Sequence, residues 1–206
     1  MSEKQQIDRS YSFWDGRYST ADYAYGTNAN DYLQSVWGHI PPGRVLSLGE
    51  GEGRNAVFLA QQEYQVVAVD FSLVGLQKAI QLAHDHSVKI NAIAVDLTTL
   101  CIKPVFWQGI ISIYCHLVPP HRAEVHQKCV QGLVKGGIFI LEAYSPRQLK
   151  YRTGGPSQLE LLMELADVLK ELRGLSFITA REIERDVYEG RYHRGKAAVI
   201  QILAKK

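Results

Sequence analysis

The sequence predicts an α/β fold: a doubly wound, mostly parallel sheet of seven strands, with helices on both faces and an antiparallel hairpin at its C-terminal end. Three observations predict it. Short apolar runs alternate with helix-like segments over most of the chain. Three glycines at alternate positions follow the first apolar run, and an Asp ends the second. Two strand-like segments close the sequence.

The first part of the chain begins with a helix over 30–39, where Tyr32, Leu33, Val36 and Trp37 recur at helical spacing before Pro41 ends it. The elements that follow are strand 44–48, helix 55–62, strand 65–70, a helix from Ser72 to residue 84, strand 89–95, strand 109–114, helix 119–132 and strand 138–143. Strands that alternate with crossover helices in this way run parallel.

The rhythm changes after Tyr144. A polar loop leads to a helix predicted over 157–172, and strands over 176–187 and 196–204 follow, joined by a turn around Gly190 and Gly195. We found no linker or repeat, so residues 1–206 are predicted to form one domain. An aromatic-rich N-terminal segment, 1–28, precedes a core over 29–206.

Composition excludes several classes of function. The chain has 206 residues, of which 46% are hydrophobic and 21% charged, as expected of a globular domain. A net charge of +2 gives no electrostatic footprint for nucleic acid or a membrane surface. The polar N-terminus and the unpaired Cys101, Cys115 and Cys129 predict a cytoplasmic protein with neither disulfide nor zinc.

Ligand-binding residues are expected at the carboxyl ends of the strands, where the strand order reverses. Gly49, Gly51 and Gly53 would let the backbone approach a ligand, and Asp70 would accept hydrogen bonds from ribose hydroxyls. The alternative is a tight turn and a helix cap, but Ser72 already offers the cap. Other residues at these ends are Phe71, Asp96, Leu97, Tyr114 to Leu117, and Glu142 to Ser145.

These positions resemble the class I S-adenosylmethionine-dependent methyltransferases. Residues 48–55 are similar to the first motif of that family, and 133–137 to the turn before its fifth strand. The resemblance covers residues 28–206 and implies the Rossmann-like methyltransferase fold, with S-adenosyl-L-methionine as the cofactor. It makes Asp70 the ribose-binding acid and places Asp96 and Leu97 along the adenine, although Asp96 could equally cap a turn.

Within the family, the sequence is most similar to the small tellurite-resistance and thiopurine-type methyltransferases, through residues 14–18, 25–26, 30–33, 53–56 and 153–156. The resemblance implies a small-molecule acceptor, such as a thiol or chalcogen nucleophile. It adds Trp14 and Asn55 to the cofactor-binding set, and the position of Cys115 after the fourth strand adds that residue. The aromatic density of the N-terminal segment makes Arg17 and Tyr18 candidate catalytic residues, and the placement of His193 in a late loop adds His193. Tyr144 and Arg152 are expected near the acceptor. A merely packed N-terminal segment is an equal alternative for Trp14, Arg17 and Tyr18.

Two positions depart from the family pattern. Ser47 stands where an acid usually precedes the glycine loop, and Glu50 stands where a small residue is common. Either Glu50 or Glu52 therefore takes over the role of the acid, or cofactor affinity is reduced. His116 lies beyond the fourth strand, where a lone histidine is usually a packing or solvent-facing residue. His126 is expected at the surface, and the cysteines as buried apolar residues.

Two other functions compete with a methyltransferase. A nicotinamide-dependent oxidoreductase also uses a glycine loop and a ribose acid, but it places the third glycine three residues after the second, whereas Gly53 lies two after Gly51. A non-enzymatic S-adenosylmethionine-binding regulator would account for Ser47 and for the lack of an obvious base. The sequence indicates no nucleic-acid or membrane partner and no metal, and it leaves the oligomeric state open.

Overall fold

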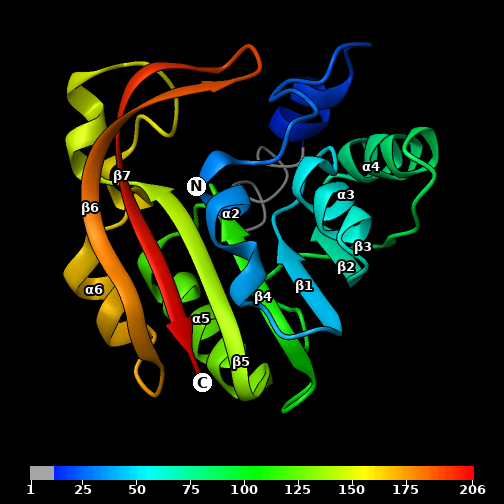
Figure 1. The fold of residues 1–206 in the computed structure, drawn as a ribbon. Coiled ribbons are helices and arrows are strands. Elements are labelled where there is room, and N and C mark those ends of the chain that lie inside the picture. The colour runs from blue at the N-terminus through cyan, green and yellow to red at the C-terminus, as the bar shows by residue number, and fades with distance from the viewer. Residues whose placement is uncertain (1–11) are drawn as a thin grey trace.

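The computed structural model describes residues 12–206, in which seven strands form one sheet of order β3-β2-β1-β4-β5-β7-β6 (Figure 1). The strands are β1 (Arg44–Leu48), β2 (Gln65–Asp70), β3 (Asn91–Ala94), β4 (Trp107–Ile113), β5 (Leu133–Tyr144), β6 (Ser176–Glu189) and β7 (His193–Lys205). The first five run parallel, and β7 lies antiparallel between β5 and β6. The predicted fold class is confirmed.

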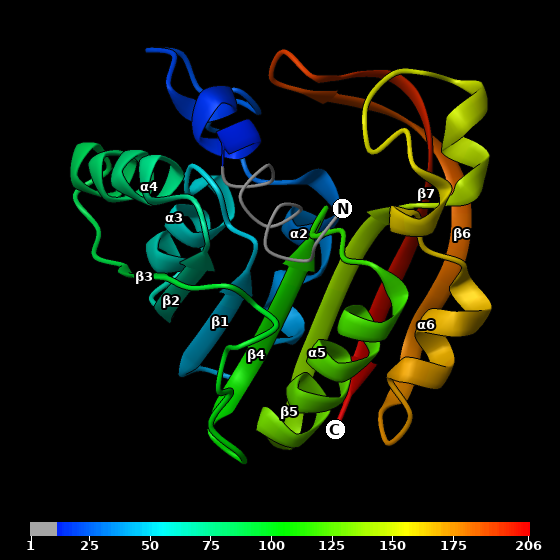
Figure 2. The same ribbon diagram turned by 180° about the vertical axis from the view of Figure 1, so that it is seen from behind.

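Helices cover both faces of the sheet (Figures 1 and 2). They are a helix over 12–18, α2 (Asp31–Val36), α3 (Arg54–Gln61), α4 (Leu73–Asp85), α5 (Pro119–Gly132) and α6 (Leu165–Glu171), with short 3-10 turns η1 (Trp37–His39), η2 (Pro146–Lys150) and η3 (Leu159–Leu161). None of the helices in the described part of the chain is long and apolar enough to cross a membrane.

Alternate residues of each strand build two cores. Leu46 and Ile110 point to the face that α5 and α6 cover, and pack with residues such as Val130 and Leu172. Their neighbours Val45 and Ile111 point to the opposite face, against α2, α3 and α4. Because both faces of the sheet are buried, the central strands are mostly apolar, which is the pattern the sequence showed.

The predicted helix over 157–172 is wrong in its first half. The structure has the short turn η3, then an extended stretch, and only then α6. The backbone N–H of Met163 donates to the carbonyl of Tyr144 at 2.9 Å, and Leu162 and Met163 are buried. Burial of these two side chains against the end of β5 outweighs the helix propensity of the segment.

Two further boundaries differ from the prediction. Strand β5 begins five residues early, directly after α5, and Gly136 adopts a φ of +83° where the register with β4 shifts. The hairpin is longer and tighter than expected, because Glu189 pairs with His193 across a turn of three residues. Its tip therefore extends beyond the end of β5 and faces the N-terminal segment (Figure 1).

Candidate active site

The glycine loop that follows β1 is held open by left-handed backbone angles. Gly49, Gly51 and Gly53 have φ of +59°, +62° and +94°. A Cβ at Gly53 would lie 2.6 Å from the Cα of Ala79 in α4, so this position requires glycine. A Cβ at Gly49 would lie 2.8 Å from the Sγ of Cys115, which places Cys115, at the end of β4, directly against the loop.

Asp70 ties the loop to the start of α4. Its Oδ2 accepts from the backbone N–H of Gly51 at 2.9 Å, and its Oδ1 accepts from the N–H of Ser72 at 2.8 Å. Burial raises the pKa of Asp70, while hydrogen bonds from these N–H groups favour the charged form and oppose the rise. The hydroxyl of Ser72 caps α4 through the N–H of Gly75, as the sequence predicted.

Glu50 occupies the space beside Ser47. Its Oε1 accepts from the backbone N–H groups of Asn55 and Ala56 at 3.0 and 2.9 Å, and its Oε2 accepts from the Ser47 hydroxyl. From within the glycine loop, this carboxylate therefore caps the N-terminus of α3 by accepting from backbone N–H groups of its first turn. Glu52 points elsewhere: it accepts from the N–H of Ala24 at 2.7 Å and pairs with Lys78.

The remaining residues predicted on the cofactor side make contacts within the chain. The Oδ1 of Asp96 accepts from the N–H and the hydroxyl of Thr98, both at 2.8 Å, so Asp96 caps its own turn. Leu97 is buried in the core, and the Oδ1 of Asn55 accepts from the N–H of Asn30 at 2.9 Å. Phe71 directly follows β2 and is half-buried.

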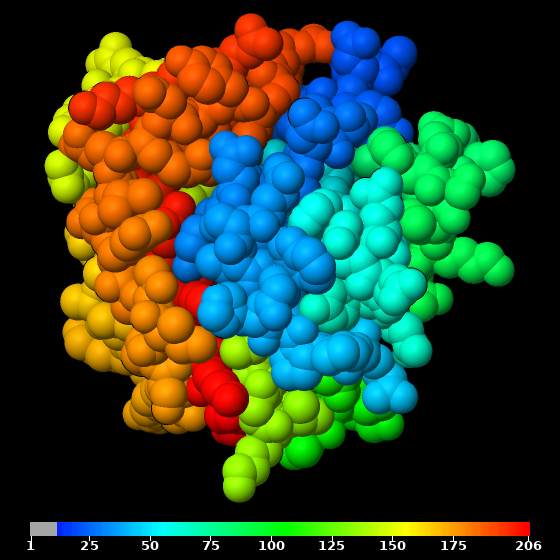
Figure 3. Space-filling view, in the orientation of Figure 1, coloured from blue at the N-terminus to red at the C-terminus, as the bar shows by residue number. Residues whose placement is uncertain are grey.

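The N-terminal segment lies over the glycine loop. A Cβ at Gly51 would lie 2.7 Å from the hydroxyl oxygen of Tyr18, so Tyr18 packs directly on the loop. The ring of Trp14 stacks on Tyr18 with 5.6 Å between centroids, and Asp15 accepts a hydrogen bond from Ser72. Figure 3 shows this segment in blue, between the hairpin in orange and α3 and α4 in cyan to green.

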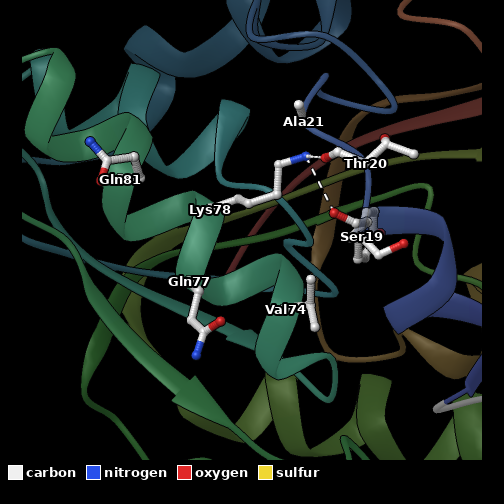
Figure 4. Close-up of a pocket in the computed structure, with 8 residues that line it drawn as sticks. Ser19, Thr20, Ala21, Val74, Gln77, Lys78 and Gln81 are labelled. Atoms are coloured by element: carbon white, nitrogen blue, oxygen red, sulfur yellow. Dashed lines mark hydrogen bonds between the residues drawn. The ribbon is translucent and has the colours of Figure 1, made fainter.

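A surface pocket of about 350 Å³ separates part of this segment from α4. Figure 4 shows Lys78 of α4 reaching across it toward Thr20, whose carbonyl accepts from the Nζ at 3.0 Å. Tyr18 forms one wall, and the other lining residues belong to 19–21 and to α4. The pocket thus lies beside the glycine loop, with Tyr18 contacting both.

A second group of side chains, which we call the ring cluster, lies at the ends of β4 and β5 and at the start of β7. It consists of Tyr114, His116, Tyr144 and His193 from these elements, together with Tyr25 from the N-terminal segment. Tyr114 stacks on Tyr144 with 4.6 Å between centroids, and His193 lies 4.6 Å from Tyr114 and 4.5 Å from Tyr25. The ring of His116 lies nearly parallel to that of Tyr144 at 5.9 Å.

Three polar atoms of the ring cluster are buried without a hydrogen-bond partner among residues 12–206: the Tyr144 hydroxyl, the Nε2 of His116 and the Nδ1 of His193. The Nδ1 of His193 lies 3.7 Å from Glu189, beyond hydrogen-bond reach. Burial lowers the pKa of His193, although Glu189 opposes the shift, and it lowers the pKa of His116 to about 4. Both imidazoles are therefore neutral near pH 7.

Arg17 joins the N-terminal segment to the tip of the hairpin. Its guanidinium lies 3.8 Å from the ring centroid of Tyr192 and donates to the Tyr25 hydroxyl at 3.2 Å. Of the residues predicted near the acceptor, Tyr144 and His193 are brought together, whereas Arg152 is exposed. Tyr18 and Trp14 lie at the glycine loop, and Arg17 lies between the two groups.

A buried network of charged side chains lies between the glycine-loop side and the ring cluster. The sequence did not predict this network. Arg54, the first residue of α3, pairs with Glu189 at 2.6 Å, and Arg185 pairs with Glu142 at 2.6 Å. The Nδ2 of Asn30 donates to both carboxylates at 2.8 Å. Glu142 inside the apolar run 138–143 was the one sign of this network in the sequence, because a carboxylate in a buried strand needs partners.

Two other expectations about single residues are wrong. His126 is buried, where its Nδ1 lies 2.7 Å from Glu171 of α6, and Arg122 pairs with the same carboxylate. Its imidazole ties α5 to α6, so packing between these helices draws it inward. Cys101 is exposed and Cys115 is only partly buried, while Cys129 is fully buried as expected.

Residues 45–137 match the family of methyltransferase domains. This stretch carries a methyltransferase domain, and the whole chain has the fold of S-adenosylmethionine-dependent methyltransferases. S-adenosyl-L-methionine is its methyl donor. Of the methyltransferase, the oxidoreductase and the non-enzymatic regulator, the methyltransferase is the function supported. The matched stretch runs from β1 to the turn inside β5 and so includes the glycine loop, Asp70 and Asp96. No curated protein is significantly similar in sequence.

Solved structures share the fold of the methyltransferase. A protein studied for the conversion of a disulfide bond into a thioacetal group during echinomycin biosynthesis aligns with a TM-score of 0.77 and 13% identity, over 95% of this chain and 91% of its own. TehB from Haemophilus influenzae aligns with a TM-score of 0.70 and 17% identity, over 95% of this chain and 66% of its own.

A third structure is an S-adenosylmethionine-dependent methyltransferase from Clostridium acetobutylicum. It aligns with a TM-score of 0.65 and 16% identity, over 99% of both chains. At these identities, the three similarities concern the fold alone. Among the described residues, no group of three or more His, Cys, Asp or Glu is placed to hold a metal ion.

Proposed function

We propose that the enzyme methylates a small molecule through a soft nucleophile, a thiol or another chalcogen. The observation that carries the proposal is that the N-terminal segment contacts both sides of the site. Tyr18 packs on Gly51 of the glycine loop, and Arg17 packs on Tyr192 at the tip of the hairpin. The N–H of Arg191 also donates to the carbonyl of Ala24 at 2.9 Å. Such a cover favours a small acceptor over a macromolecule.

The cofactor is assigned to the glycine-loop side. The proposed binding set is Trp14, Gly49, Gly51, Gly53, Asn55, Asp70, Phe71, Asp96, Leu97 and Cys115. The fit rests on the left-handed glycines, whose lack of side chains lets the backbone approach a ligand closely, and on the carboxylate of Asp70 at the end of β2. When bound, S-adenosylmethionine supplies a methyl group already activated on a sulfonium. The chain's task is then to hold and orient the acceptor.

The acceptor is assigned to the ring cluster. Its rings are neutral and polarisable, and its unpartnered atoms offer hydrogen bonds without a fixed charge, which suits a thiol better than a carboxylate or phosphate. A soft nucleophile needs orientation more than activation, and orientation can contribute roughly 7–11 kcal/mol. His193 would contact the acceptor, and Arg17 and Tyr18 would close the site.

A labelled-methyl screen tests the proposal. The protein is incubated with S-adenosylmethionine carrying a labelled methyl group and with panels of thiols, selenite and tellurite, phenols, carboxylates, peptides and RNA. We expect label in the thiol or chalcogen products. The Arg17→Met variant should transfer more slowly while binding S-adenosylhomocysteine normally in calorimetry. Transfer confined to peptides, RNA or carboxylates would contradict the proposed acceptor.

A further inference from the structure

We infer that the Nε2 of His116 takes the proton of the methyl acceptor, so that the acceptor binds protonated and loses its proton within the ring cluster. This inference rests on the proposed function and extends it, because it names the group that receives the thiol proton. His116 lies directly after Cys115, whose sulfur is against the glycine loop, and its ring lies along that of Tyr144. His116 therefore belongs to the ring cluster and directly follows, in the chain, a residue that contacts the glycine loop.

The tautomer of His116 is set by the backbone. Its Nδ1 lies 2.8 Å from the carbonyl oxygen of Leu161 in η3. A carbonyl can only accept, so Nδ1 carries the hydrogen and Nε2 carries the lone pair. The extended stretch after η3, which replaces the predicted helix, presents this carbonyl to the histidine.

The lone pair of Nε2 is buried and meets no donor among residues 12–206. A buried acceptor without a donor costs free energy, and such atoms in folded proteins call for an explanation. The groups that face His116 are the Tyr144 ring from β5, His193 from β7, Arg122 from α5 and the Leu161 carbonyl. Burial and the charge of Arg122 lower the pKa of His116, although the hydrogen bond to Leu161 opposes the shift, so the ring stays neutral and Nε2 remains an acceptor.

The other two unpartnered atoms suit different tasks. Burial raises the pKa of Tyr144, so its hydroxyl stays protonated and can donate to a lone pair of the acceptor. His193 faces Glu189, which already pairs with Arg54, so a proton on His193 would join an established charge network. His116 is the member of the ring cluster whose free nitrogen has its protonation state fixed by a hydrogen bond on the other side of the ring.

The step balances as a substitution. A lone pair of the acceptor sulfur forms the bond to the methyl carbon, and the bond from that carbon to the sulfonium breaks, returning its electron pair to the cofactor sulfur. As that bond forms, the S–H bond of the acceptor breaks and its proton moves to the Nε2 of His116 and then to solvent, so the acceptor becomes a neutral thioether. A weakly basic imidazole is sufficient, because the thiol proton becomes more acidic as the bond to the methyl carbon forms.

The test compares two thiols in the wild-type protein and in the His116→Gln variant. The glutamine amide can still donate to the Leu161 carbonyl but cannot take a proton. An aliphatic thiol is protonated at neutral pH, whereas a fluorinated thiophenol is already ionised. We expect kcat/KM of the variant to fall about 100-fold with the aliphatic thiol, as for loss of a general base, and to stay near wild type with the thiophenol. His84→Gln, on the exposed end of α4, is the matched control.

Nitrogen-15 NMR of histidine-labelled protein provides a second readout, in which His116 should show a protonated Nδ1 and a bare Nε2. Thermal unfolding of the variant establishes that it is folded. Equal losses with both thiols, or a protonated Nε2, would overturn the inference while leaving the proposed function standing. If the wild-type protein methylates neither thiol but transfers to another class of acceptor, the proposed function fails and the inference falls with it.

Discussion

The two sides of the site differ in how completely the chain satisfies its own polar groups. On the glycine-loop side, Asp70, Glu50 and Glu52 each accept hydrogen bonds from backbone N–H groups. In the ring cluster, Tyr144, His116 and His193 each leave a buried polar atom without a partner among residues 12–206. The glycine loop is therefore preorganised by its own hydrogen bonds, while the unpaired polar atoms of the ring cluster are available to bind a ligand. The proposed cofactor site is therefore held by hydrogen bonds within the chain, whereas the proposed acceptor site has unpaired hydrogen-bonding groups.

The largest expected effect comes from breaking the link between the two sides. The Glu189→Gln variant leaves the buried guanidinium of Arg54 without its counter-charge, and removing one partner of such a pair costs about 3–5 kcal/mol of unfolding free energy. Urea unfolding measures the loss. Glu184→Gln is the control on the same strand, because Glu184 pairs with Arg147, Lys150 and Lys196 at the surface. Equal losses in both variants would contradict the special role of the buried pair.

The pair between Arg54 and Glu189 also predicts that the free energy of unfolding decreases at acidic pH. Burial alone would raise the pKa of Glu189, but the charge of Arg54 and the contact with His193 outweigh it and lower the pKa to about 2. The carboxylate therefore adds stability above its ordinary pKa of 4.5, on the order of 3 kcal/mol, and loses it as pH falls from there to about 2. The gap in stability between wild type and Glu189→Gln should narrow over this window. A stability difference that stays constant between pH 4.5 and about 2 would contradict the lowered pKa of Glu189.

On the loop side, Asp70→Asn tests whether the organised loop is also the donor site. The amide cannot accept two backbone N–H groups as a carboxylate does, and it holds ribose hydroxyls less strongly. We expect the affinity for S-adenosylhomocysteine to fall about 10- to 100-fold, as for hydrogen bonds to a charged group. Calorimetry measures it. Asp96→Asn is the comparison, because Asp96 already caps its own turn, and a smaller loss is expected there.

The smallest expected effect comes from removing the hydroxyl group of one of the two stacked tyrosines, Tyr114 or Tyr144. Tyr114 donates to Glu142 at 2.9 Å, whereas the hydroxyl of the adjacent Tyr144 has no partner among the described residues. Tyr114→Phe should lower the free energy of unfolding by about 1–3 kcal/mol. Tyr144→Phe should leave it unchanged or raise it by about 1 kcal/mol, while the KM for the acceptor increases. A stability loss in Tyr144→Phe equal to that in Tyr114→Phe would show that the hydroxyl is not open.

The sequence predicted the fold and the glycine loop after β1 for a physical reason. Gly49 to Gly53 and Asp70 belong to one local unit, and left-handed angles and apolar strands leave a mark on neighbouring residues. The ring cluster joins Tyr25, Tyr114, Tyr144 and His193, which are far apart in the chain, and no local pattern connects them. The helix over 157–172 failed for the same reason, because a hydrogen bond to distant Tyr144 redirects the backbone.

The contact between Ser47 and Glu50 also constrains how this enzyme can evolve. Glu50 lies three residues after Ser47 and accepts both from its hydroxyl and from the N–H of Ala56 at the start of α3. Restoring an Asp at position 47 alone would set two buried carboxylates against each other, and replacing Glu50 alone would strip the helix of its acceptor. Substitutions at positions 47 and 50 are therefore coupled, and a change at one is expected to be tolerated best together with a change at the other.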